Sequence, residues 1–375
     1  MAYSFTEFLD SISKAKISND ESYREGQLGT IIDIYEDEFP DIVKADIILL
    51  GCTDQRGAGL PRPSDSALEI RKEFYKLYYW HTDLNIADIG NVKTGKTITD
   101  TYAALKVILR ELIQERKKVI ILGGSHDLTL AQYDAFVAEN QLINAVGIDA
   151  IIDINLDAPF KSDNFLMDLL TAEPNYLQHY NHIGFQSYFI HPKMLETMDK
   201  LRFDCYRVGK VKEHIEEMEP VIRNCHMLTF DISALANAFA PANRISPNGL
   251  NGEEACILMQ YAGMSNTLKT IGIYGYRSEN DVQNLTSKQI SHMLWYYLDG
   301  NSRGNREAQI NERESFNEYH TAFSELETTF LQSKKTGRWW MQLPDKQFIA
   351  CSYKDYLLAS SNEIPERWLR AQERP

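Results

Sequence analysis

His126 lies between Ser125 and Asp127 and follows a double glycine at the end of the apolar run Val119–Leu122. The run is typical of a buried strand, and the residues after Asp127 are typical of a helix. This order predicts an imidazole at the carboxyl end of a strand, where open α/β sheets bind their ligands. An imidazole in that place can be a metal ligand or a hydrogen-bonded strand-end residue.

A second motif with possible chemistry is Gly90–Thr97, which reads GNVKTGKT and matches the phosphate-binding pattern G-x-x-x-x-G-K-T. It follows a predicted strand and precedes a helix, as that pattern requires. In such a loop Lys96 would contact the β- and γ-phosphates, and Thr97 would hold magnesium. The loop has few glycines, however, and we favour an ordinary turn in which Gly95 has a positive φ.

The elements that position these residues are apolar, β-branched runs that alternate with helical patterns. In Ala103–Gln114, apolar residues recur at helical spacing, as expected for a helix on one face of a sheet. Alternating strands and helices form mainly parallel sheets with right-handed crossovers. We therefore expect an α/β fold, a three-layer α/β/α sandwich with a mainly parallel sheet of about eight strands. The expected strands are Ile47–Gly51, Asn85–Ile89, Lys118–Leu122, Ile151–Leu156, His182–Phe185, Asp204–Val208, Met227–Phe230 and Thr270–Tyr274.

Three regions follow from these patterns: an N-terminal helical extension at 1–44, the α/β domain at 45–300 and a C-terminal accessory segment at 301–375. The accessory segment begins with a polar stretch and is then rich in aromatic residues. Because so many aromatic side chains need burial, we expect the segment to pack on the domain or on a neighbouring subunit. The aromatic residues are Trp339, Trp340, Phe348, Tyr353 and Tyr356.

Composition excludes several classes of protein. The chain has 375 residues and is 43% hydrophobic, which is enough for one large core. The formal net charge of -14 argues against a nucleic-acid partner. No apolar run is long enough to cross a membrane, and the first residues do not resemble a signal peptide. The five cysteines are scattered without a CxxC pair, so we expect reduced thiols in a cytoplasmic protein.

From about Ile47 to Tyr276 the chain resembles the ureohydrolase superfamily, which includes arginase, agmatinase and formimidoylglutamase. LGGSHDLTLAQYDAF is similar to the family's Gly-Gly-Asp-His-Ser strand end. LTFDISALANAFAP resembles the strand in which active members read Asp-x-Asp-x-x-Asp-Pro, and ISPNGLNGEEA resembles their Pro-Gly-Gly-Leu segment. The resemblance implies an arginase-like fold and C–N hydrolysis of linear amidines or guanidines.

Active members of this family hold two manganese ions. The ligands are the histidine after the double glycine, the residues of an Asp-Ala-His-x-Asp motif and both aspartates of Asp-x-Asp, and the ion pair makes hydroxide available. On this resemblance His126 matches the histidine and Asp231 the first aspartate of the last motif. Ser233 stands at the second aspartate, and Ala236 begins the pair that replaces the later Asp-Pro. Ser125 and Asp127 also depart from the family's pattern around the histidine.

The middle motif can be aligned in two registers, and we favour the one that starts at Asp157. It puts Pro159 at the histidine and Lys161 at the last aspartate, and the Leu-Asp-Ala run and the following phenylalanine fit it well. In this register the Lys161 ammonium could replace a divalent cation and neutralise Asp157 and Asp231.

The other register starts four residues earlier, at Asp153, and ends at Asp157 with Asn155 at the histidine. It leaves His126, Asp153, Asp157 and Asp231 as one intact metal site. In either register the second manganese lacks a histidine and a carboxylate.

The family's catalytic glutamate should fall near Tyr274 or Gly275, where the chain has no acidic residue. We therefore favour a family protein whose dimanganese site is largely dismantled, a scaffold or small-molecule-binding pseudoenzyme with no metal or with one Mn²⁺ at a partial site. The alternative is a formimidoylglutamase- or agmatinase-like C–N hydrolase with a single metal. Nucleotide binding through Gly95, Lys96 and Thr97 is a weaker alternative. The resemblance also implies a homo-oligomer, because family members form dimers, trimers or hexamers.

Overall fold

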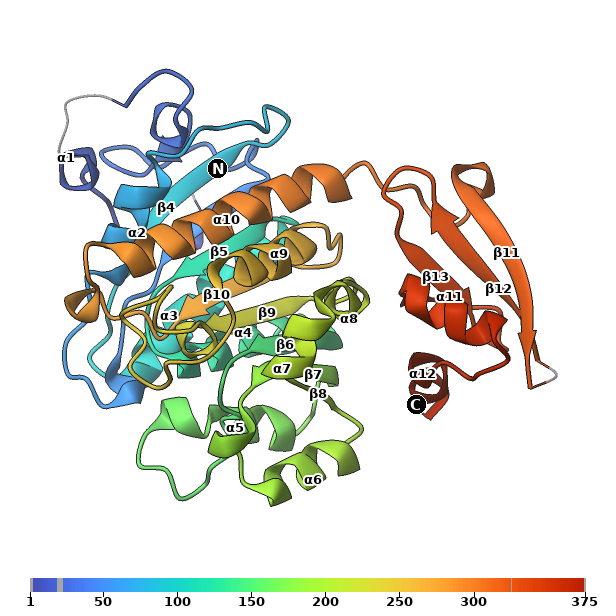
Figure 1. Ribbon diagram of the computed structural model, residues 1–375. Helices are drawn as coiled ribbons and strands as arrows, with labels where there is room; N and C mark the ends of the chain where they lie inside the picture. Colours follow the sequence, from blue (N-terminus) through green and yellow to red (C-terminus); the bar gives the residue numbers. More distant parts are fainter. Residues whose placement is uncertain (1–2, 19–22, 325, 374–375) are drawn as a thin grey trace.

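The computed structural model describes residues 3–18, 23–324 and 326–373, and it contains two units (Figure 1). The larger unit is a layered α/β domain that ends with helix α10. The smaller unit follows α10 and is built on a second sheet.

The large sheet contains ten strands, in the order β1-β4-β3-β5-β10-β9-β6-β7-β8, and β2 also pairs with β4. Its pairs are parallel except β1 with β4. The central strands β3 and β10 are buried along their whole length, as expected for parallel strands covered on both faces. The strands are β1 Leu9–Asp10, β2 Asp33–Ile34, β3 Ile47–Gly51, β4 Ile86–Val92, β5 Lys118–Leu122, β6 Ile143–Ile148, β7 Leu177–Phe185, β8 Asp204–Arg207, β9 Met227–Asp231 and β10 Thr270–Tyr274.

Helices cover both faces of this sheet and give three layers. Buried residues of α2, α7, α8, α9 and α10 share one core, and those of α3, α4, α5 and α6 share the other. The predicted three-layer α/β/α sandwich is confirmed. The helices are α1 Lys14–Ile17, α2 Ser66–Phe74, α3 Ile98–Gln114, α4 Thr129–Val137, α5 Phe165–Thr171, α6 Pro192–Lys200, α7 Val208–Glu213, α8 Met218–Ile222, α9 Gly252–Gly263 and α10 Leu285–Gly304.

One predicted strand is wrong. Residues 151–156 form an irregular loop, and the strand lies earlier, at β6, where it pairs with both β7 and β9. Gly147 makes β6 resemble a turn in the sequence, yet the structure needs a glycine there, because a side chain would collide with the Tyr180 hydroxyl. Because β6 ends at Ile148, the chain leaves the sheet at Asp149.

The N-terminal region is not the helical extension that the sequence suggested. Within its described residues, the only α-helix is the four-residue α1. The strands β1 and β2 instead join the large sheet, because both pair with β4, β1 antiparallel and β2 parallel.

The C-terminal unit is an antiparallel sheet in the order β11-β12-β13-β14, with two helices on one face. Trp339 is buried on the helix-covered face and Trp340 on the opposite face, where Arg223 of the α/β domain lies 4.5 Å from the centroid of its ring. The elements are β11 Phe316–Phe323, β12 Leu326–Ser333, β13 Trp339–Gln342, β14 Phe348–Cys351, α11 Tyr353–Ser360 and α12 Glu366–Glu373.

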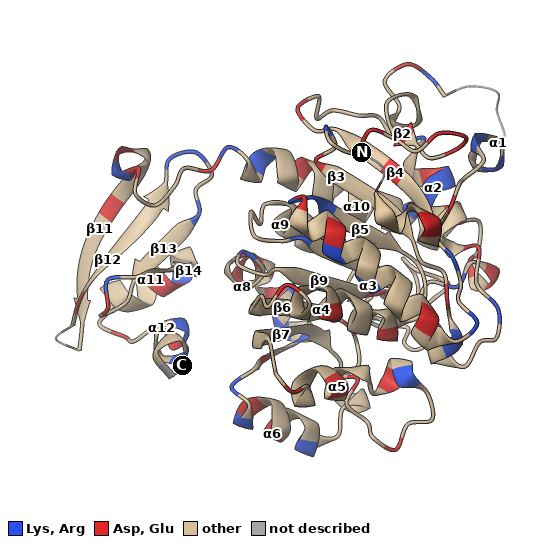
Figure 2. Cartoon of the chain, turned by 180° about the vertical axis from the view of Figure 1, so that it is seen from behind, with Lys and Arg blue, Asp and Glu red and all other residues tan. Residues whose placement is uncertain are grey.

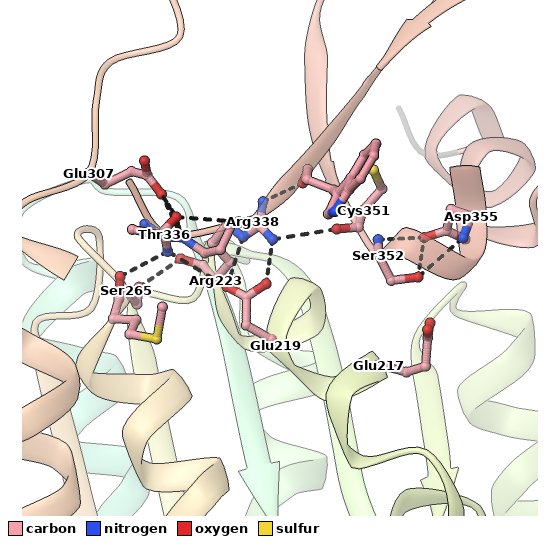
Figure 3. A network of polar contacts seen from close by, with 12 residues as sticks. Glu217, Glu219, Arg223, Ser265, Glu307, Thr336, Arg338, Cys351, Ser352 and Asp355 are labelled. Carbon is pink, nitrogen blue, oxygen red and sulfur yellow. Dashed lines mark hydrogen bonds and ion pairs between the residues drawn. The ribbon is translucent and has the colours of Figure 1, made fainter. Parts of the chain in front are cut away.

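Buried polar contacts join the C-terminal unit to the α/β domain (Figure 3). Arg223 pairs with Glu219 and donates a 2.6 Å hydrogen bond to the Trp339 carbonyl oxygen. Arg338 pairs with Glu307 at 2.8 Å and donates to the Met264 carbonyl oxygen at 3.1 Å. Because Arg223 and Met264 precede β9 and β10, the unit is attached at the amino-terminal ends of the strands.

The surface carries charges of both signs. In the view of Figure 2, lysine and arginine residues are interspersed with acidic residues over the α/β domain. None of the described helices has the length and apolar character needed to cross a bilayer.

Candidate metal centre

Three strands of the large sheet, β5, β9 and β6, bring one histidine and three aspartates to its carboxyl edge. His126 follows β5, Asp149 follows β6, and Asp231 is the last residue of β9. Asp153 reaches the same place from the loop after β6. Since β5, β10, β9 and β6 are adjacent and parallel, their ends meet at one edge.

The distances within this cluster are those of a cation site. His126 Nδ1 lies 2.9 Å from Asp153 Oδ2, 3.0 Å from Asp149 Oδ2 and 3.8 Å from Asp231 Oδ2. The Nδ1 atom is buried and has no partner with hydrogen-bond geometry among the described residues. The other ring nitrogen, Nε2, lies 3.2 Å from the Thr229 hydroxyl, which fixes the ring. A buried imidazole nitrogen facing three carboxylates is a donor set for one divalent cation.

Electrostatics agree with this assignment. Burial and the charge of Asp149 raise the pKa of Asp231 to about 6 and that of Asp153 well above its usual range. Burial lowers the pKa of His126, but the carboxylates of Asp149 and Asp153 raise it by more. Without a metal, a protonated His126 lowers the pKa of Asp149 and partly offsets the crowded carboxylates, and a divalent cation would take over this role when the His126 proton leaves.

The described residues offer no such donor set for a second cation. Ser233 Oγ donates a hydrogen bond to Asp149 Oδ1, and the Ile151 backbone N–H donates to the same oxygen at 3.0 Å. The Ser233 N–H donates to Asp231 Oδ1 at 2.8 Å. The Oδ1 atoms of Asp149 and Asp231 are thus hydrogen-bonded to the protein. The apolar residue Ile151 lines the cavity beside the cluster.

The structure places Asp149, which neither sequence register of the middle motif included, beside His126 and Asp153, whereas Asp157 lies outside this cluster. Asp149-Ala150-Ile151-Ile152-Asp153 has the spacing of the Asp-Ala-His-x-Asp motif, with Ile151 at the position of the histidine. The Asp-Ala pair, followed by an aspartate three residues later, was the signal in the sequence. It was missed because a strand was expected where the loop begins.

The downstream residues of those registers lie in an exposed loop, away from the cluster. Asn155, Asp157 and Pro159 are exposed, and the Asp157 N–H bonds to the Asn155 side chain at 3.2 Å. Lys161 pairs with Asp168 at 2.7 Å, so it does not neutralise Asp157 or the buried aspartates as expected.

The remaining departures from the family's pattern have structural roles. The Ser125 N–H and hydroxyl both donate hydrogen bonds to the Asp54 carbonyl oxygen, at 3.0 and 3.3 Å. Asp127 is buried and accepts a hydrogen bond from the Tyr102 hydroxyl. The Ala236 N–H bonds the Leu250 carbonyl oxygen at 2.9 Å.

The phosphate-loop motif consists of the last three residues of β4 and the turn that leads to α3. Thr97 caps α3 through its hydroxyl, and the carbonyl oxygens of Gly95, Lys96 and Thr97 accept hydrogen bonds from Arg56. The positive φ of the motif is at Gly90, +91°, and not at Gly95 as expected. The loop therefore presents carbonyl oxygens to an arginine, whereas a phosphate would need N–H groups.

Gly275 lies where the family's catalytic glutamate was expected. Its φ is +76°, and an added Cβ would lie 2.5 Å from Asp231 Oδ2. A glutamate therefore does not fit this backbone.

A cavity of about 200 Å³ opens beside the cluster. Apart from the four donors, it contains both charged and apolar side chains, and none of its lining residues comes from the C-terminal unit. Its lining includes Ile151, Asp163, Arg244, Ile245 and Arg277.

Comparison with known proteins agrees with this architecture. The sequence model of the arginase family matches residues 45–298. The formimidoylglutamase of Staphylococcus haemolyticus is 23% identical over 248 residues, which cover 61% of this chain and 76% of that protein. The formimidoylglutamase of Staphylococcus aureus strain JH9 is 22% identical over 265 residues, covering 67% and 85%.

Solved structures show the same fold. Formimidoylglutamase from Bacillus subtilis superposes with a TM-score of 0.66 at 15% identity, over 77% of this chain and 96% of that one. Trypanosoma cruzi formiminoglutamase with Mn²⁺ superposes with a TM-score of 0.65 at 14% identity, over 74% and 98%.

Proposed function

Since this chain belongs to the arginase family, we propose that it binds one divalent cation, of the Mn²⁺ type, and a small molecule beside it. The cation ligands are His126, Asp149, Asp153 and Asp231. We propose further that the chain does not carry out the two-manganese hydrolysis of guanidines and amidines.

The observation that carries the proposal is the buried Nδ1 of His126, which lies 3.0 and 2.9 Å from carboxylate oxygens of Asp149 and Asp153, so that one cation could contact all three residues. A neutral imidazole would supply its lone pair to the cation while Thr229 holds the opposite nitrogen. A bound cation supplies positive charge and polarises a ligand oxygen. Carboxylates and imidazole suit manganese among the common divalent ions.

The loss of ordinary hydrolysis rests on three positions. Ile151 and Ser233 replace two ligands of the second ion, and Ser233 occupies an oxygen of Asp149 that a second ion would share. Gly275 replaces the acid of the family and cannot accept its side chain without strain. The chain therefore keeps a cation site but lacks the pair of ions that activates water.

Metal content tests the cation site. Protein stripped with EDTA and dialysed against Mn²⁺ should retain one ion per chain by mass spectrometry of the metal. Asp153→Asn should lose this ion, whereas Asp157→Asn, the matched change in the exposed loop, should keep it. Zero ions in the unaltered protein, or equal losses in both variants, would contradict the site.

Turnover tests the second half of the proposal. We expect no release of urea or formamide from arginine, agmatine or formimidoylglutamate by the loaded protein. Turnover with one ion per chain would instead support a single-metal C–N hydrolase. The complete donor set for one ion is the observation that favours this alternative.

We also propose a homo-oligomer, as the family resemblance implies. Trp339 and Trp340 are buried, but Trp80 is 75% exposed and contacts Trp295 on α10. Exposed tryptophan is typical of protein interfaces. Sedimentation of the unaltered protein and of Trp80→Ser should show an oligomer that the variant weakens, whereas a monomeric unaltered protein would refute the proposal.

A further inference from the structure

We propose that the cavity beside the metal donors takes a small oxyanion with an apolar body, such as a carboxylate, and rejects guanidinium and amidinium cations. This inference rests on the proposed function, because it names the ligand class of the same site. It is carried by two unpaired arginines, by the lack of an acid at Gly275 and by the apolar side chains around them.

Charge in the cavity outside the metal donors favours an anion. Arg244 and Arg277 line it together with one acid, Asp163, so this part of the wall has a net charge of +1. Neither guanidinium makes a hydrogen bond or ion pair with another residue that the structure describes, and Arg277 is half-buried. A guanidinium that the protein leaves unpaired in a cavity wall can bind a carboxylate with two parallel hydrogen bonds.

A cationic ligand meets little compensating charge there. At Gly275 no side chain projects into the cavity, and Asp163 is the only lining acid besides the three metal donors. A bound divalent cation would cancel most of the charge of those donors. A guanidinium or amidinium group would then lie beside two arginines and a metal ion, which is unfavourable.

The cavity wall is also apolar in part. Ile151 takes the place of the family's imidazole ligand, and Ile232 and Ala242 line the same space. Ile245 lines the cavity and is 48% exposed, which places it at the opening. A ligand with an apolar body would bury these surfaces, whereas a small hydrophilic anion would leave them wet.

Benzoate and benzamidine test the charge preference, because they share a planar shape and differ in the sign of their charge. Calorimetry with the Mn²⁺-loaded full chain should show benzoate binding at least tenfold tighter than benzamidine. Arg277→Met should weaken benzoate binding at least tenfold, and Arg303→Met, at an exposed position on α10 outside the cavity, should not change it. If Arg277→Met does not fold, Arg244→Met provides the same test.

Acetate tests the apolar part of the proposal. Benzoate should bind at least tenfold tighter than acetate, and Ile245→Ser should weaken benzoate but not acetate. Equal binding of the two anions, tighter binding of benzamidine, no binding of benzoate, or binding that does not depend on either arginine would each overturn the inference. Metal content, measured on the same samples, separates this failure from a failure of the cation site.

Discussion

Rebuilding the lost ligands should give the site a second cation. The double variant Ile151→His/Ser233→Asp places an imidazole and a carboxylate beside Asp149 and Asp231, whose Oδ1 atoms now accept hydrogen bonds from residues 151 and 233. The variant should bind two Mn²⁺ ions per chain where the unaltered protein binds one.

The cost without metal follows from burial. Ser233 is 2% exposed and contacts Asp149, so a new carboxylate there adds a fourth negative group to a buried cluster. Two like charges about 4 Å apart repel by about 4 kcal/mol at an effective dielectric constant of about 20. In EDTA we therefore expect the free energy of unfolding to fall by about 3 to 5 kcal/mol.

Metal should reverse this loss. A cation at 100 times its dissociation constant stabilises the folded state by about 2.7 kcal/mol per site, so two sites should return about 5 kcal/mol. Urea unfolding in EDTA and in Mn²⁺ measures both values, and the increase should be twice that of the unaltered protein. Ile151→His/Ser233→Asn, which has similar volume without the charge, should retain one ion. A double variant with one ion and an unchanged metal-dependent gain would refute the reasoning.

Three further predictions concern other parts of the chain. Arg223→Met should lower the free energy of unfolding by about 3 kcal/mol, because it leaves a buried glutamate without its close partner. In urea unfolding, the control variant Arg303→Met, at an exposed position, should change the free energy of unfolding by less than about 0.5 kcal/mol. Equal effects of the two variants would contradict the role of Arg223 in joining the C-terminal unit to the domain. Gly275→Glu should destabilise the fold by at least about 1 kcal/mol and weaken Mn²⁺ binding, since its side chain would collide with Asp231. Thermal unfolding and metal content measure the two effects, and a variant in which both are unchanged would contradict the prediction. Calorimetry should show no ATP binding that depends on Lys96. Micromolar binding that Lys96→Ala abolishes would contradict the assignment of this motif as an ordinary turn.

Much of the fold could be predicted from the sequence because the central strands are buried on both faces. Continuous apolar runs such as Lys118–Leu122 mark such strands directly, and the structure has β5 at those residues. The strand β6 was missed because its glycine and asparagine look like turn residues, and only the packing of Tyr180 explains the glycine. The C-terminal sheet was missed because its strands are short or half-exposed.

The candidate site depends on that one misplaced strand. His126 and Asp231 were identified from motifs at strand ends, and the structure brings them to within 3.8 Å of each other. Asp149 was missed, although it is the residue that contacts both His126 and Ser233. Placing the loop after Ile148 rather than after Leu156 moves the start of the motif from Asp157 to Asp149, by eight residues, and gives the four donors of the proposed cation site.

The number and place of bound ions test the account most directly. Crystals grown with excess Mn²⁺ should show one anomalous peak, bound by His126, Asp149, Asp153 and Asp231, and no peak between Ile151 and the carboxylates. Two occupied peaks, or none at the His126 cluster, would contradict it.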